Sequence, residues 1–118
     1  FIEKVVSIIE ESIIDPQLSV EELSKNMAMS RSSLHKKLKS LSGYVPNELI
    51  KLIRLKHAAK LLQTNDHSIA EIAYMTGFSS PSYFSKCFLH QFKLTPKEYA
   101  EKKPKSDTRG LGDFINKN

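Results

Sequence analysis

The stretch that decides the fold is SIAEIAYMTGFSSPSYFSKCF, residues 68–88. Ser68, followed three residues later by Glu71, is a capping-box pattern that begins a short helix, and Ser80 before a proline begins a second helix. Between the two helices, Gly77 can adopt a positive φ without steric cost. Two helices that cross through a turn of three or four residues form a helix-turn-helix. The stretch therefore predicts one such unit.

The same pattern occurs earlier in the chain, so the sequence contains an internal repeat. Each copy has a serine-capped short helix, a tight turn, a second capped helix with basic residues, and a helix begun by proline. The matched residues are Ser19 with Ser68, Glu22 with Glu71, Ser24 with Ala73, Ala28 with Gly77, Ser30 with Ser80, Lys36 with Lys86, and Pro46 with Pro96. Alanine tolerates a positive φ less well than glycine, so the first turn is predicted to differ from the second or to be strained.

Helical periodicity continues on both sides of the repeated units. Apolar spacing predicts helices over 2–14 and 46–63, and Thr95 before a proline begins a last short helix that runs to about residue 102. Since no segment alternates between polar and apolar residues, the predicted fold class is all-α. The expected domains are a first helix-turn-helix subdomain at 1–45, a linker helix at 46–64, a second helix-turn-helix subdomain at 65–103 and a flexible tail at 104–118.

Positive charge is concentrated in two blocks of the chain. The 118 residues carry a net charge of +5, with 18 Lys and Arg against 13 Asp and Glu. Residues 30–60 have eight basic side chains against Glu48 alone, and residues 77–105 have six lysines against two glutamates. Such blocks suit a polyanion, although a solvated basic face is equally consistent with the charge alone. Two repeated units, each with a basic second helix, favour duplex DNA over a protein-binding helical hairpin.

The repeat and its flanking segments resemble the AraC/XylS family of bacterial transcription regulators. The resemblance is carried by LSVEELS at 18–24, MSRSSLHKKLK at 29–39, IRLKHAAKLL at 53–62, the stretch at 68–88, and TPKEY at 95–99. It implies seven helices, with two helix-turn-helix subdomains joined by a long linker helix. Leu38, Leu89 and Lys93 depart from the family pattern, and Lys93 stands where a glycine is usual in the turn before the last helix.

The first recognition segment also resembles the output domains of hybrid two-component regulators, which implies a sensory region before Phe1. By resemblance, DNA bases would be read by exposed side chains of two recognition helices. These are Arg31, Ser32, His35 and Lys36 in the first helix, and Pro81, Ser82, Ser85 and Lys86 in the second. Phosphate contacts would come from Ser30, Lys37, Lys39 and Ser80. Arg and Lys can donate to guanine, and serine can donate or accept, so the chemistry suits the major groove.

Because the two recognition helices differ, the expected site is asymmetric, with two unlike boxes in adjacent major grooves. For each of these residues, a solvated surface side chain is the alternative interpretation.

Other functions have less support from the residues. The four histidines lack the spacing of a zinc site, and we find no phosphate-binding glycine loop or nucleophile elbow. We therefore expect no enzyme activity, no metal and no cofactor. RNA is disfavoured because its duplex has too narrow a major groove for a recognition helix. The main alternative is a helical module that binds another protein, and binding that survives high salt would favour it.

The remaining expectations concern location and partners. The single cysteine, Cys87, excludes an internal disulfide framework, is expected to pack as a small buried hydrophobe, and fits a cytoplasmic location. No apolar run approaches the ~20 residues that span a bilayer, so no membrane contact is expected from this segment. Besides double-stranded DNA, RNA polymerase is an expected partner. Any dimerisation is expected through regions outside this chain.

Overall fold

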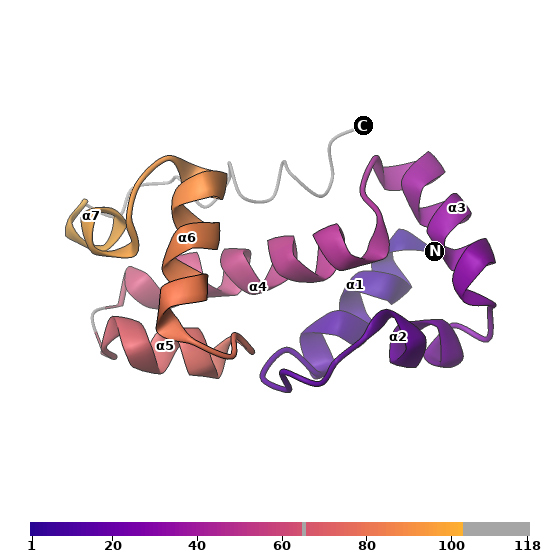
Figure 1. The fold of residues 1–118 in the computed structure, drawn as a ribbon, viewed down its shortest axis with the longest axis horizontal. Helices are drawn as coiled ribbons and strands as arrows, with labels where there is room; N and C mark the ends of the chain where they lie inside the picture. The colour runs from indigo at the N-terminus through magenta and orange to yellow at the C-terminus, as the bar shows by residue number, and fades with distance from the viewer. Residues whose placement is uncertain (65, 103–118) are drawn as a thin grey trace.

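The computed structural model describes residues 1–64 and 66–102, and in these residues it contains seven α-helices and no β-strand (Figure 1). The helices are α1 (Ile2–Glu11), α2 (Val20–Asn26), α3 (Arg31–Ser42), α4 (Pro46–Leu62), α5 (Ile69–Met75), α6 (Pro81–Phe92) and α7 (Pro96–Glu101). The predicted all-α class is confirmed, with helix-turn-helix units formed by α2–α3 and α5–α6 on either side of the long helix α4. The predicted flexible tail, 104–118, lies outside the described residues.

Hydroxyl side chains decide where most of the helices begin. Ser19, Ser30, Ser68, Ser80 and Thr95 each have extended backbone angles, and each accepts a hydrogen bond from the backbone N–H three residues later. At Ser68 and Thr95 the backbone N–H also donates to the glutamate carboxylate three residues on, at 2.7 and 2.9 Å. Loss of one such cap typically costs ~1 kcal/mol. The helix starts predicted from the sequence are therefore set by local chemistry.

The helix predicted over 2–14 is shorter in the structure. α1 ends at Glu11, and the N–H groups of Ser12 and Ile13 donate to carbonyl oxygens three residues back instead of four. Asp15 follows and precedes Pro16, and a residue before proline is disfavoured in the helical region. The chain therefore tightens into a turn before the proline.

The turn after each recognition helix uses one residue in the left-handed region. Gly43 has φ +83° and Lys93 has φ +64°, and each donates its backbone N–H to the carbonyl four residues earlier. The turn at Lys93, where the family pattern has a glycine, thus has the same form as the turn at Gly43. The left-handed conformation costs a residue with a side chain roughly 1–2 kcal/mol. The Nζ of Lys93 donates to the carbonyl oxygen of His90 at 3.0 Å across this turn.

The buried side chains form two clusters, and α4 contributes to both. The first cluster contains Val5, Ile9, Leu23, Leu34, Leu38, Leu49, Ile50 and Ile53. The second contains Leu55, Ala58, Ala59, Leu62, Ile72, Ala73, Phe78, Phe84 and Phe88. The N-terminal half of α4 thus belongs to the first cluster and its C-terminal half to the second. This division explains why the apolar residues of α4 do not follow one narrow stripe.

Aromatic side chains dominate the second cluster. Neighbouring rings of Phe78, in the turn before α6, and of Phe84, Phe88 and Phe92, on α6, lie 4.6–5.7 Å apart, centroid to centroid. Tyr99 of α7 meets the Phe88 ring edge-on at 5.3 Å, a geometry that aromatic pairs favour. Cys87 packs against this cluster and is half-buried. The rings hold α6 firmly in place over the C-terminal half of α4.

Candidate nucleic-acid interface

The four predicted base-reading residues of the first unit lie together on α3. Arg31, Ser32, His35 and Lys36 are exposed and line one surface hollow with the start of α4. The opposite face of α3 carries the buried leucines of the first core. Helical spacing i, i+1, i+4 and i+5 places such residues on one face. The sequence therefore builds a continuous row of three cationic or ionisable groups and one hydroxyl, open to solvent.

The corresponding residues of α6 are less uniformly exposed. Ser82 and Lys86 are exposed, whereas Pro81 and Ser85 are half-buried. Lys86 borders a second hollow, which α6 forms with the N-terminal half of α4. In the ribbon, α6 crosses over the C-terminal half of α4 while α3 lies near its N-terminal end (Figure 1). The two rows therefore occupy separate places along the linker helix.

The predicted phosphate contacts have partners of their own within the chain. The hydroxyl oxygens of Ser30 and Ser80 accept the N–H groups of Ser33 and Tyr83, at 3.0 and 3.1 Å, and so cap α3 and α6. A hydroxyl that accepts such a bond still has its own O–H to donate. These two serines can therefore both start a helix and donate to a phosphate at its N-terminus, where anions are favoured.

The two lysines predicted to touch phosphate also make contacts. The Nζ of Lys37 lies 4.6 Å from the centroid of the Phe1 ring, and the Nζ of Lys39 donates to the carbonyl oxygen of Gly43 at 3.2 Å. Both lysines are exposed. An exposed cation–π contact is worth about 0.5–1 kcal/mol, which is small against a phosphate contact in a binding site. Neither contact prevents these side chains from reaching outward.

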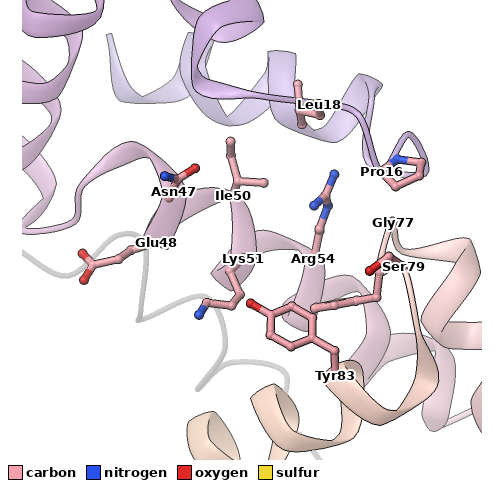
Figure 2. Close-up of a pocket in the computed structure, with 11 residues that line it drawn as sticks. Pro16, Leu18, Asn47, Glu48, Ile50, Lys51, Arg54, Gly77, Ser79 and Tyr83 are labelled. Carbon is pink, nitrogen blue, oxygen red and sulfur yellow. The ribbon is translucent and has the colours of Figure 1, made fainter.

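The residue Lys51 was missed by the sequence analysis as a candidate contact. It is exposed on α4, between two buried neighbours, and it lines both the hollow beside Lys86 and the cleft that contains Tyr83. In the close-up, the Lys51 and Tyr83 side chains extend into the same part of this cleft (Figure 2). Asn47, one turn earlier, lines the same cleft and also the α3 hollow. These two residues join the α3 and α6 surfaces.

Arg54 belongs to the basic block of the sequence, but it does not add to the basic surface. Its side chain is half-buried, its Nη2 donates to the backbone carbonyl of Asp15 at 2.7 Å, and its Nε is buried. Burial lowers the pKa of the Arg54 guanidinium, and the negative charge of Asp15 opposes that shift. The guanidinium remains a cation, because arginine side chains are not deprotonated in proteins. Arg54 is therefore a structural cation.

Residues 1–64 and 66–102 contain no group of three or more His, Cys, Asp and Glu side chains that could hold a metal ion. Within the same ranges, no helix has the length and apolar character needed to cross a membrane. The polar and basic rows on α3 and α6, with Asn47 and Lys51 between them, are thus the candidate interface. Their donors suit base edges and phosphates.

Comparison with known proteins places the chain among regulators. The family model described as a helix-turn-helix domain matches residues 23–102, more than half of the chain. Histidine kinase P4 of Formosa agariphila is 43% identical over 98 residues, which cover 83% of this chain and 7% of that protein. The HTH-type transcriptional activator RhaS of Mannheimia succiniciproducens is 33% identical over 88 residues, which cover 75% of this chain and 33% of the relative. The chain thus spans one third or less of these relatives.

Solved structures share the fold. A transcriptional regulator from Chromobacterium violaceum, described as having an AraC-type DNA-binding domain, has a TM-score of 0.79 against this chain. The two are 31% identical, and the match covers 91% of this chain and 90% of that one. The DNA-binding domain of AdpA, a global transcriptional factor solved in complex with a target DNA, has a TM-score of 0.77 and 31% identity over 84% of this chain and 88% of that one. The repeated helix-turn-helix units, the family match and these neighbours agree: the chain belongs to the AraC/XylS family of helix-turn-helix transcription regulators.

Proposed function

We propose that this chain binds duplex DNA in a sequence-specific manner to regulate transcription, with α3 and α6 in adjacent major grooves of an asymmetric two-box site. The observation that carries the proposal is the exposed row of Arg31, Ser32, His35 and Lys36, repeated on α6 in a different form. A neighbour with 31% identity was solved in complex with a target DNA, which supports the same partner here.

The length of α4 supports the placement of two recognition helices on one DNA face. Its 17 residues span about 25 Å at the usual rise of an α-helix. Recognition helices that enter successive major grooves are about 34 Å apart, or one turn of DNA. α3 and α6 pack on opposite halves of α4, so the two units can reach neighbouring grooves. If straight DNA does not present both grooves to the protein, bending costs of order 1–6 kcal/mol.

The residue roles follow from donor chemistry. We assign base contacts to the rows already described, because Arg and Lys donate to guanine O6 and N7, and each good bidentate contact discriminates by ~1–3 kcal/mol. We assign phosphate contacts to Ser30, Ser80, Lys37 and Lys39, which flank these rows. Pro81 and Ser82, the first two residues of α6, suit contacts with a thymine methyl. The two boxes are unlike because the two rows have different side chains.

We also propose the kind of larger protein to which this domain belongs. The 43% identity to a protein named as a histidine kinase, confined to 7% of that protein, supports a role as the output domain of a hybrid two-component regulator. With that role, chromosomal DNA and RNA polymerase are the proposed partners, and the proposed location is cytoplasmic. Dimerisation through regions outside this chain is compatible with it.

The direct test is selection from random duplexes of about 30 base pairs, roughly three turns of DNA, at physiological salt. Enrichment of two different boxes about one helical turn apart supports the proposal. Enrichment of one box shows that only one unit reads bases. If a folded protein enriches nothing, the result points to a protein-binding module or to a domain that needs a dimerisation region outside this chain. Salt-dependent binding to unselected duplex separates the two, because phosphate contacts weaken steeply as salt rises and a protein-binding module makes none.

A further inference from the structure

The two helix-turn-helix units meet at the side chain of Arg54. From α4, its guanidinium extends toward the loop between α1 and α2, where Nη2 donates to the carbonyl oxygen of Asp15 at 2.7 Å (Figure 2). On its other side lies Gly77, in the turn between α5 and α6. A Cβ added at Gly77 would lie 2.6 Å from Nε and 2.9 Å from Cζ of Arg54. The guanidinium is thus held between the first unit and the turn of the second.

Gly77 is in close contact both with the Arg54 guanidinium and with the backbone at the end of the α1 segment. The same added Cβ would also collide with the backbone carbonyl oxygen of Ile13, at the end of the first subdomain's opening segment. Gly77 is buried and has φ +90°. The loop after α1, the guanidinium and the turn of the second unit therefore touch without space for a methyl group.

This contact is well placed to control the angle between the units. The two buried clusters share no residue among the described ranges, so α4 is their main connection. A cleft of about 470 Å³ lies beside the contact, bounded by the α1–α2 loop, α4 and the start of α6. Side chains do not fill this cleft, and the units could close or rotate across it. Arg54 is the side chain that spans from α4 to the loop on the far side.

The chemistry of Arg54 is better suited to orienting the two helix-turn-helix units than to stabilising the fold. A half-buried guanidinium loses hydration, and it recovers one backbone hydrogen bond while its Nε has no partner in the described residues. The cost of desolvating a charged group can exceed what its contacts return, so a buried charged contact is weak evidence for stability. A directional hydrogen bond, in contrast, fixes one geometry. The Arg54 contact therefore contributes little to stability but defines the angle between the two helix-turn-helix units.

We infer that Arg54 is a positioning residue, which fixes the orientation of the two recognition helices and so sets the spacing between boxes that the domain accepts. The inference rests on the proposed two-box function. One added base pair moves the second box by about 3.4 Å and rotates it by about a tenth of a turn. A rigid pair of units loses contacts under that change, and a loosened pair recovers them.

The test uses the selected two-box duplex and versions with one base pair added or removed between the boxes. With the unaltered chain, either change should weaken binding by about tenfold, as a mismatch in one box does. With Arg54→Leu, the change should weaken binding by less than about threefold, while binding to a duplex with one intact box stays the same. Lys60→Leu is the control, because it removes an equal charge from an exposed position of the same helix.

The outcomes separate this inference from the proposed function. If the unaltered chain binds one box as tightly as two, the two-box function is wrong. If it requires both boxes and Arg54→Leu retains the full spacing penalty, the positioning role is wrong. Should Arg54→Leu fail to fold in urea unfolding measurements, Arg54→Gln replaces it, since glutamine keeps an amide donor but removes the charge and the reach. Arg54→Lys should restore part of the spacing penalty.

Discussion

Ala28 and Gly77 occupy the same place in the two helix-turn-helix turns, and both have a positive φ, of 56° and 90°. Each turn closes with the next residue's N–H donating to a carbonyl five residues back, from Met29 to Ser24 at 3.0 Å and from Phe78 to Ala73 at 2.9 Å. The strain predicted for the first turn is therefore present as a left-handed alanine, without a change in the turn's form. The two positions differ in surroundings: Ala28 is exposed, and Gly77 is buried.

Ala28→Gly should stabilise the domain by about 0.5–1 kcal/mol. The left-handed region costs alanine roughly 1–2 kcal/mol, and glycine returns part of that gain through the larger conformational entropy of its unfolded chain. Urea unfolding of the two proteins gives the difference directly. A lower midpoint for the glycine variant would contradict the left-handed conformation at Ala28.

Gly77→Ala should destabilise the domain by about 2–4 kcal/mol, because backbone strain adds to a collision with Arg54 and the Ile13 carbonyl. Gly43→Ala is the matched control. Gly43 has φ +83°, but an added Cβ there meets nothing within 4 Å. It should therefore lose only the strain, about 1–2 kcal/mol. Equal losses for the two variants would show that the contact around Gly77 is not tight.

Lys39→Ala and Lys37→Ala should weaken DNA binding to a similar extent for all sequences. Each should also reduce the slope of log K against log salt by about 1, since one phosphate contact is lost. Titrations of specific and random duplexes at several salt concentrations measure both effects. Lys25→Ala, at an exposed position of α2, is the control and should leave the slope unchanged. A loss confined to one base position would instead identify a base contact.

The charge of the two recognition helices differs strongly. α3 carries Arg31, Lys36, Lys37 and Lys39 with no acidic residue, whereas the only lysine or arginine of α6 is Lys86. Phosphate contacts dominate the salt dependence of DNA binding. We therefore expect α3 to supply more of the salt-dependent affinity than α6, whatever the sequence of the duplex. Replacing Lys37 and Lys39 together by alanine should reduce the slope of log K against log salt by about 2, whereas Lys86→Ala should reduce it by about 1 at most. Gel-shift titrations at several salt concentrations test this order, and equal reductions would contradict it.

Much of the fold could be predicted because its signals are local. Serine caps, prolines at helix starts and the repeat itself each depend on residues within a few positions of one another, and they placed α2, α3, α5 and α6. The end of α1 was predicted too late, since apolar spacing continues through Ile13 while the backbone has already left the helix. The absence of glycine did not exclude a left-handed turn, because Lys93 adopts that conformation with φ +64°.

The candidate site was less predictable where it depends on tertiary contacts. Arg54 and Lys51 are basic residues one turn apart on α4, yet Arg54 turns into the junction of the two units and Lys51 faces the clefts. Because α4 packs against two clusters in succession, its sequence has no single polar face that would separate these two roles. The rows on α3 and α6 could be found because each lies on a helix with one buried face.

The most direct test of the two-helix account is a base-preference profile of His35→Ala and of Lys86→Ala, measured on libraries of the selected operator with every position varied. His35 is exposed on α3 and Lys86 on α6. The account predicts that each variant loses ~1–3 kcal/mol of discrimination in a different box and keeps the preferences of the other. Loss of preference at the same base positions in both variants would contradict it.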